Sequence, residues 1–257
     1  MKVVILAGGL GTRLGGDTAL MPKPMVEIGG RPILWHIMKI YSHFGMNDFV
    51  ILLGYKGYVI KEYFANYFLH RSDVTIDLCT NSMETHNNRC EPWKVTLMDT
   101  GLKTQTGGRL RRIRDFIGNE TFMVTYGDGV ADIDVNALLK YHRSHGKAAT
   151  LTAVQPEGRF GRILFESTGR INNFREKPLD DHAWVNGGFF VCEPEMFRFI
   201  EGGDDTIFER APLQNLAAAG ELFAYKHEGS WLCMDTPRDK KLLNEIWEKD
   251  KAFWKLW

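Results

Sequence analysis

The sequence lacks the features that would direct a chain to a membrane, to nucleic acid or to an oxidising compartment. It has four cysteines in 257 residues, with no C-x-x-C pair, which argues against a disulfide framework and a structural zinc site. Thirty-two basic residues balance thirty-two acidic ones, so net charge attracts no polyanion. No apolar run reaches the roughly 20 residues that span a bilayer, and the apolar opening is too short for a signal peptide. We expect a soluble cytoplasmic protein that binds neither nucleic acid nor membrane.

The N-terminal stretch carries the most informative pattern in the chain. Residues 3–7 are apolar and too few for a helix, which predicts a buried strand. A glycine-rich loop and an arginine follow, and Lys23 lies between two prolines. Glycines let a backbone approach a ligand closely, while an arginine fork and a mobile lysine bind phosphate oxygens. The pattern therefore predicts a phosphate-binding loop, and its alternative is a plain glycine turn that leads to a surface arginine.

Two common phosphate-binding loops do not fit this stretch. A dinucleotide fingerprint, G-x-G-x-x-G, that began at Gly9 would need a glycine where the chain has Leu14. A mononucleotide P-loop would need a lysine after Gly16, where the chain has Asp17. The loop must therefore belong to another class.

Predicted strands and helices alternate along the first 150 residues. This alternation predicts an α/β fold with a mixed, mostly parallel central sheet and helices on both faces. Shorter strands after about residue 150 predict a smaller lobe (151–257) packed on the first half (1–150) within one domain, because no Pro/Gly/Ser-rich linker separates them. Strands are expected at 48–53, 74–78, 95–98, 121–126 and 148–154, helices at 33–44, 57–69, 110–117 and 135–145, and a second glycine loop at 104–109.

The segment L-A-G-G-x-G-T-R-L, with a lysine ten residues after its arginine, resembles the sugar-1-phosphate nucleotidyltransferase family. The resemblance implies a Rossmann-like nucleotidyltransferase fold and the joining of a nucleoside triphosphate to a sugar 1-phosphate. Such a phosphoryl transfer needs cations, positioning and a divalent metal rather than covalent catalysis. It implies catalytic roles for Arg13 and Lys23. The nucleotide-binding residues that it implies are Leu6, Ala7, Gly8, Gly9, Gly11, Thr12, Arg13, Lys23, Thr106, Gly108, Arg109 and Gly127.

Two carboxylates are the candidate ligands for Mg²⁺. Asp128 follows the predicted strand 121–126 between two glycines, and Asp235 precedes Thr236-Pro237. Ligands of parallel sheets lie beyond the carboxyl ends of the strands, and the resemblance places metal-binding aspartates at both positions. The alternatives are a Gly-Asp-Gly turn for Asp128 and a helix N-cap for Asp235 or Thr236.

Two further motifs concern the sugar phosphate. Glu176-Lys177-Pro178 follows a predicted strand, and Asn186-Gly187-Gly188 lies inside the next one. Carboxylate and amide groups suit sugar hydroxyls, and an ammonium suits a phosphate. The resemblance accordingly implies sugar-phosphate contacts by Glu176, Lys177, Asn186 and Gly187.

The motifs T-G-G-R-L, T-Y-G-D-G-V, E-K-P, N-G-G-F-F-V and M-D-T resemble those of family members that use CTP and glucose 1-phosphate. The resemblance implies a CDP-glucose product for dideoxyhexose and O-antigen synthesis. It also implies that the Gly108 backbone faces cytosine and that Arg109 faces the triphosphate. The alternatives are another nucleotide (dTTP or UTP), another sugar 1-phosphate, or a non-enzymatic sugar-nucleotide sensor.

Two regions suggest a homo-oligomer. Residues 80–94 are polar and without clear periodicity, which fits either a subunit contact or a plain surface loop. The final helix, expected from Pro237 to the end of the sequence, contains many large aromatic residues. Such a segment fits either a cap on the core or a subunit interface.

Overall fold

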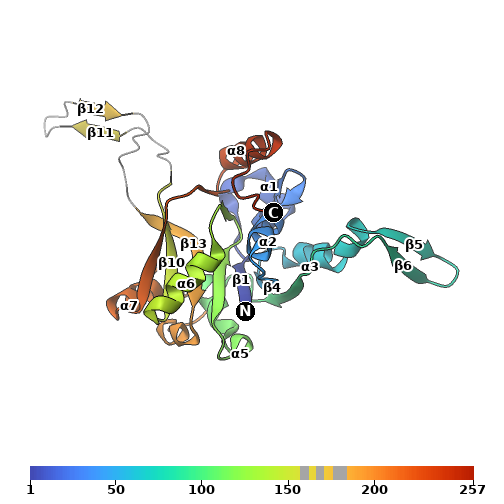
Figure 1. Cartoon of the computed structure of the whole chain (residues 1–257), viewed down its shortest axis with the longest axis horizontal. Coiled ribbons are helices and arrows are strands. Elements are labelled where there is room, and N and C mark those ends of the chain that lie inside the picture. The colour runs from blue at the N-terminus through green and yellow to red at the C-terminus, as the bar shows by residue number, and fades with distance from the viewer. Residues whose placement is uncertain (157–161, 166–170, 176–183) are drawn as a thin grey trace.

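The chain folds around one seven-stranded sheet (Figure 1), seen in a computed structural model that describes residues 1–156, 162–165, 171–175 and 184–257. The strand order is β14-β10-β13-β8-β1-β4-β7. Only β13 runs antiparallel to its neighbours in this sheet, so the predicted mixed, mostly parallel sheet is confirmed. The strands are β1 (Lys2–Leu6), β4 (Asp48–Leu53), β7 (Lys94–Asp99), β8 (Phe122–Tyr126), β10 (Ala149–Val154), β13 (Val185–Cys192) and β14 (Leu222–His227).

Helices cover both faces of the sheet because the strands are apolar on both sides. Val3 and Ile5 of β1 belong to a core cluster with α2 and α6. Val4 and Leu6 point the other way and belong to a second cluster with α4, α5 and α7. The helices are α1 (Gly16–Leu20), α2 (Ile33–His43), α3 (Gly57–Ala65), α4 (Thr106–Arg112), α5 (Arg114–Ile117), α6 (Val135–His145), α7 (Ala211–Ala218) and α8 (Pro237–Glu248). None of the helices in the described ranges has both the length and the apolar character needed to cross a bilayer.

Several predicted boundaries were wrong. The strand expected at 74–78 does not join the central sheet. It forms β5 (Asp73–Asp77), which pairs with β6 (Ser82–His86) in a hairpin that projects from the body of the molecule (Figure 1). The expected glycine loop at 104–109 is instead largely the first turn of α4. Two of the strands after residue 150, β13 and β14, extend the central sheet.

The aromatic C-terminal residues pack on the core. The helix α8 ends at Glu248, earlier than expected, and the chain continues as a tail to residue 257. Trp254 in this tail is 1 % exposed and donates its indole N–H to His36 Nδ1 of α2 at 3.3 Å. The core-cap alternative is therefore confirmed for Trp254.

Candidate active site

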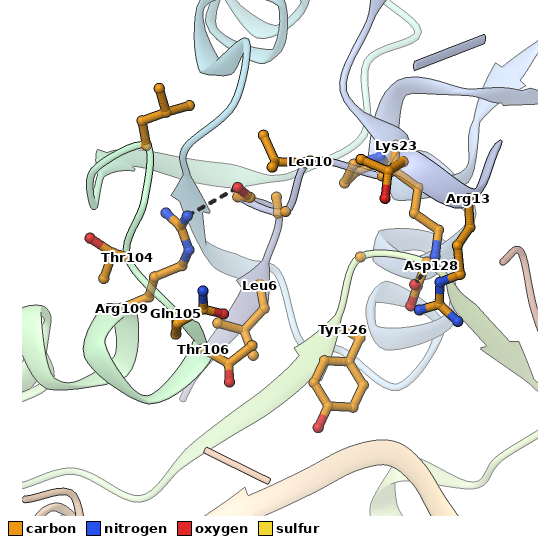
Figure 2. A pocket seen from close by; sticks show the side chains of 18 of the residues that line it. Leu6, Leu10, Arg13, Lys23, Thr104, Gln105, Thr106, Arg109, Tyr126 and Asp128 are labelled. Atoms are coloured by element: carbon orange, nitrogen blue, oxygen red, sulfur yellow. Dashed lines mark hydrogen bonds and ion pairs between the residues drawn. The ribbon is translucent and has the colours of Figure 1, made fainter. Parts of the chain in front are cut away.

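A cavity of about 760 Å³ lies at the carboxyl ends of β1 and β8. Its wall includes every residue that the sequence predicts to bind nucleotide except Gly108, together with both predicted metal ligands. Figure 2 shows Arg13, Lys23 and Asp128 at one end of the cavity and residues 104–106 at the other, with Tyr126 between them. The cavity thus has a charged end, and a polar end at residues 104–106 that Lys103 also lines.

The charged end is built around Lys23. Its Nζ contacts Asp128 Oδ2 closely and lies 2.6 Å from Asp235 Oδ1. The Lys23 side chain is only 13 % exposed. Burial alone would lower the pKa of Lys23, but the carboxylates of Asp128 and Asp235 outweigh it and raise this pKa above its ordinary value. Lys23 therefore stays protonated and partly neutralises both aspartates.

Arg13 adds a second cation on the solvent side of the cluster. Its Nη1 lies 3.1 Å from Asp235 Oδ2, and its side chain is 75 % exposed. An exposed guanidinium keeps most of its hydrogen-bonding donors available. Arg13 can therefore bind an incoming phosphate from the solvent side of the cluster.

A short strand pairing brings together two aspartates that are far apart in the sequence. The strand β9 (Gly129–Ala131) pairs antiparallel with β15 (Trp231–Cys233), and Gly129 is opposite Cys233. The N–H of Met234 also donates to the Asp128 carbonyl at 2.9 Å. The carboxylates that follow β8 and β15 are thereby held at one point.

The predicted helix cap at Thr236 is confirmed. Thr236 Oγ1 accepts from the Asp239 N–H at 3.3 Å, and the Asp239 carboxylate accepts from the backbone N–H groups of Thr236 and Asp235. This is a capping box at the start of α8. Thr236, and not Asp235, is therefore the N-cap residue, and the Asp235 carboxylate bonds to Lys23.

The two aspartates suit a divalent cation. The Lys23 ammonium bonds to both of them and so marks a point where one cation is shared by two carboxylates. Oxygen ligands of this kind are preferred by Mg²⁺, which commonly takes one or two carboxylates and fills its octahedron with water and substrate phosphates. Within the described ranges no third His, Cys, Asp or Glu completes a metal site. A cation held by these two carboxylates would have room for phosphate and water ligands.

Arg109 lines the cavity from behind the glycine loop. Its side chain is buried at 3 % exposure. The guanidinium donates to the Leu53 carbonyl at 2.8 Å, to Thr100 Oγ1 at 2.6 Å and to the Gly8 carbonyl at 3.0 Å (dashed line in Figure 2). A Cβ at Gly8 would lie 2.2 Å from Arg109 Cζ, so glycine is required there. The arginine supports the glycine loop from behind, and its hydrogen bonds are directed at protein oxygens.

Gly108 is not part of the cavity wall. Its N–H donates to the Thr206 carbonyl at 3.1 Å, so it is not directed at a base. A Cβ at Gly108 would lie 2.9 Å from Asp204 Cα. The glycine therefore allows α4 to pack against residues 204–206. The polar end of the cavity is lined by side chains that the sequence reasoning did not single out, namely Thr104 and Gln105.

The sugar-side predictions are only partly described. Glu176 and Lys177 lie outside the described residues. Asn186 Nδ2 donates to Tyr126 Oη at 3.1 Å, and Tyr126 lines the cavity. The Gly187 carbonyl accepts from Trp231 Nε1 at 2.8 Å. Tyr126 was missed as a site residue, although its position next to Gly127-Asp128 at the end of a predicted strand is a signal for it.

The fold and this charged cleft define a nucleotidyltransferase. Residues 2–240 match the family model described as "Nucleotidyl transferase", and the chain belongs to that family. It is 57% identical to glucose-1-phosphate cytidylyltransferase of Salmonella typhi, with 100% of both chains covered. It is 44% identical to a probable glucose-1-phosphate cytidylyltransferase of Bacillus subtilis, again over 100% of both.

A solved structure agrees with the fold. HddC from Yersinia pseudotuberculosis superposes with a TM-score of 0.70 over 96% of this chain and 99% of that one, at 22% sequence identity. At this identity the likeness concerns the fold alone. It supports the architecture of the sheet and its helices.

Proposed function

We propose that this protein transfers a cytidylyl group from CTP to α-D-glucose 1-phosphate and releases pyrophosphate. The observation that carries the proposal is the convergence of Arg13, Lys23, Asp128 and Asp235 at one end of a nucleotide-sized cavity, in a chain 57% identical over its full length to an enzyme with this name. A non-enzymatic sensor would not need this set of cations and carboxylates. The product would supply dideoxyhexose and O-antigen synthesis in the cytoplasm, as the resemblance implies.

In this reaction a phosphate oxygen of the sugar phosphate forms a bond to the α-phosphorus of CTP. The bond from that phosphorus to the bridging oxygen breaks, and pyrophosphate leaves with the electron pair. Arg13 binds and orients the triphosphate from the open side of the cavity. Lys23 supplies a second positive charge to the phosphate oxygens. Mg²⁺, when held by Asp128 and Asp235, supplies charge neutralisation for the same oxygens.

The two substrates are expected to occupy different ends of the cavity. The base would lie against residues 104–106, whose side chains are polar and uncharged, and the triphosphate would extend along the Gly8–Gly11 loop toward Lys23. The sugar phosphate would be bound by Glu176, Lys177, Asn186 and Gly187. Asn186 fits this role because its side chain reaches the cavity wall through its bond to Tyr126.

Pyrophosphate release tests the proposal directly. The protein is incubated with glucose 1-phosphate and Mg²⁺, and CTP, UTP, dTTP, ATP and GTP are offered in turn. We expect release with CTP. Release confined to UTP or dTTP would refute the cytidylyl assignment while keeping the reaction class, and no release with any of the five would refute both parts of the proposal.

Two conservative variants test the metal ligands. Asp128→Asn and Asp235→Asn should each leave the fold intact and remove most Mg²⁺-dependent activity, because an amide carries no charge for the metal. Asp115→Asn, at an exposed position on α5, is the matched control and should behave as the parent. Full activity in both cavity variants would contradict the metal assignment.

We also propose that the β5–β6 hairpin contacts a second copy of this chain. A two-stranded hairpin is marginally stable by itself in water, and this one carries three exposed apolar side chains: Ile76 at 57 %, Leu78 at 89 % and Met83 at 48 %. Sedimentation should show an oligomer for the parent and a smaller species for Leu78→Glu. Phe116→Glu, on α5 and 42 % exposed, is the control. A monomeric parent would refute the proposal.

A further inference from the structure

One carboxylate outside the cavity wall connects two parts of that wall. Glu209 is an exposed residue that precedes α7. Its Oε2 accepts from Thr106 Oγ1 at 2.7 Å, and its Oε1 accepts from Tyr126 Oη at 2.5 Å. Thr106 is the first residue of α4 at the polar end of the cavity, and Tyr126 is the last residue of β8. A single side chain thus bonds to two separate parts of the wall.

On the sugar side, the connection continues to Asn186. Tyr126 Oη accepts from Asn186 Nδ2 at 3.1 Å, and Asn186 Oδ1 accepts from the Gly188 N–H at 2.9 Å. The Tyr126 ring packs against Gly188, where a Cβ would lie 2.4 Å from Tyr126 Cδ2 and where φ is +81°. The tyrosine therefore has little freedom to rotate away from this contact.

The charge of Glu209 sets the direction of these hydrogen bonds. A carboxylate only accepts, so Tyr126 must donate its single hydroxyl proton to Glu209. Tyr126 can then only accept from Asn186, which turns the amide nitrogen toward the ring and the amide oxygen toward Gly188.

On the base side, Thr106 is held by two bonds of opposite direction. Its Oγ1 accepts from the Phe208 N–H at 2.9 Å and donates to Glu209. A backbone hydrogen bond joins the same two segments, since the Gln105 N–H donates to the Asp204 carbonyl at 2.6 Å. Residues 204–209 therefore form a support behind the start of α4.

We propose that Glu209 is a positioning residue for both substrates. Through Thr106 it fixes the wall at the base end, and through Tyr126 it fixes the Asn186 amide at the sugar end. It touches neither substrate. The identity of the two substrates rests on the function proposed above, whereas the link between the two walls rests on the hydrogen bonds alone.

Four variants test the inference: Glu209→Ala, Glu209→Gln, Tyr126→Phe and Thr106→Val. The measurements are the Kd of CTP by calorimetry, the KM of glucose 1-phosphate, kcat and Tm. Glu209→Ala should raise the Kd of CTP and the KM of glucose 1-phosphate by about tenfold each. This corresponds to the loss of an ordinary hydrogen bond at each wall. Tyr126→Phe should raise mainly the KM of glucose 1-phosphate, and Thr106→Val mainly the Kd of CTP. Glu201→Gln, an exposed carboxylate in the preceding segment, is the control and should match the parent.

The effect of a positioning role can be separated from that of a structural one. Because Glu209 is exposed, its variants should melt within about 2 °C of the parent. Glu209→Gln keeps the shape of the side chain, but its amide can donate to Tyr126. This variant should therefore also raise the KM of glucose 1-phosphate. The double variant that combines Glu209→Gln with Tyr126→Phe should then raise the KM of glucose 1-phosphate no further than the more affected of the two single variants does. Substrate constants within twofold of the parent in Glu209→Ala, or additive effects in the double variant, would overturn the inference.

The parent enzyme separates this test from that of the proposed function. A parent that releases no pyrophosphate from CTP and glucose 1-phosphate refutes the proposed substrates. A parent that is active while Glu209→Ala is equally active refutes the positioning role. The two failures are therefore distinguishable in a single experiment.

Discussion

Lys23 occupies the point between Asp128 and Asp235 at which we propose that Mg²⁺ binds, so the ammonium and the metal compete for the same carboxylates. A charge-assisted hydrogen bond contributes about 1.5–3 kcal/mol, and Lys23 makes one to each aspartate. Allowing for partial solvation of Asp128 and Asp235, which are 26 % and 20 % exposed, the competing interaction is about 2 kcal/mol. Lys23→Met removes it and should tighten divalent-metal binding by about 30-fold.

The assay is a titration of the nucleotide-free protein with Mn²⁺, followed by electron paramagnetic resonance of the free ion. Arg13→Met is the matched control. Arg13 makes one contact at 3.1 Å to the same aspartate from a side chain that is 75 % exposed, and exposed ion pairs are worth about 0.2–1 kcal/mol. Its removal should therefore tighten Mn²⁺ binding by no more than about fivefold.

The reasoning would be refuted if Lys23→Met bound Mn²⁺ as weakly as the parent or more weakly. A further variant, Lys23→Met with Asp128→Asn, should lose the gain because it also loses a ligand. If the gain persisted, the ion would be binding away from these carboxylates. The catalytic consequence is separate, since Lys23→Met should also lower turnover by the loss of a cation on the phosphates.

Three further predictions concern stability and are read by urea unfolding. Arg109→Ala should lower the free energy of unfolding by about 3–5 kcal/mol, since it removes a buried group that donates three hydrogen bonds, whereas an unchanged midpoint would contradict the supporting role. Thr236→Ala should cost about 1 kcal/mol through the loss of the α8 cap. Burial lowers the pKa of His36 from 6.5 to about 4, so the unfolded chain binds a proton below about pH 6.5 that the folded chain does not. The contribution of His36 to the free energy of unfolding should be fully present above that pH and lower by about 2 kcal/mol at pH 5. His36→Gln should remove most of this pH dependence.

Local sequence patterns predicted those elements that depend on neighbouring residues or on a general rule of sheet topology. The first strand and the glycine loop were predictable because a short apolar run that ends in glycines has few other structures available. Asp128 was predictable as a site residue because the carboxyl ends of parallel strands share one edge. These features depend on near neighbours in the sequence or on a general rule of topology.

Other features depend on contacts that no local pattern records. An arginine beside glycines fits a ligand-binding group, and only the folded chain reveals that Arg109 is buried against backbone carbonyls 56 and 101 residues away. Glu209 bonds to residues 103 and 83 positions away and has no local signal of its own. The second strand of the β5–β6 hairpin was missed because β6 is almost wholly exposed and so lacks the alternation that marks a half-buried strand.

The central sheet also limits how the protein can adjust to its substrates. The strand β8, which ends at Tyr126, pairs with β13 over four residues, from Phe122–Cys192 to Thr125–Phe189, and β13 carries Asn186. A hinge between the two substrate-binding walls would have to break this ladder. We therefore expect substrate entry and product release to depend on the segments at the rim, residues 9–24 and 102–106, while the platform beneath both substrates stays rigid. The time that each turnover spends opening and closing would then be set by short loops rather than by the rotation of one half of the molecule against the other.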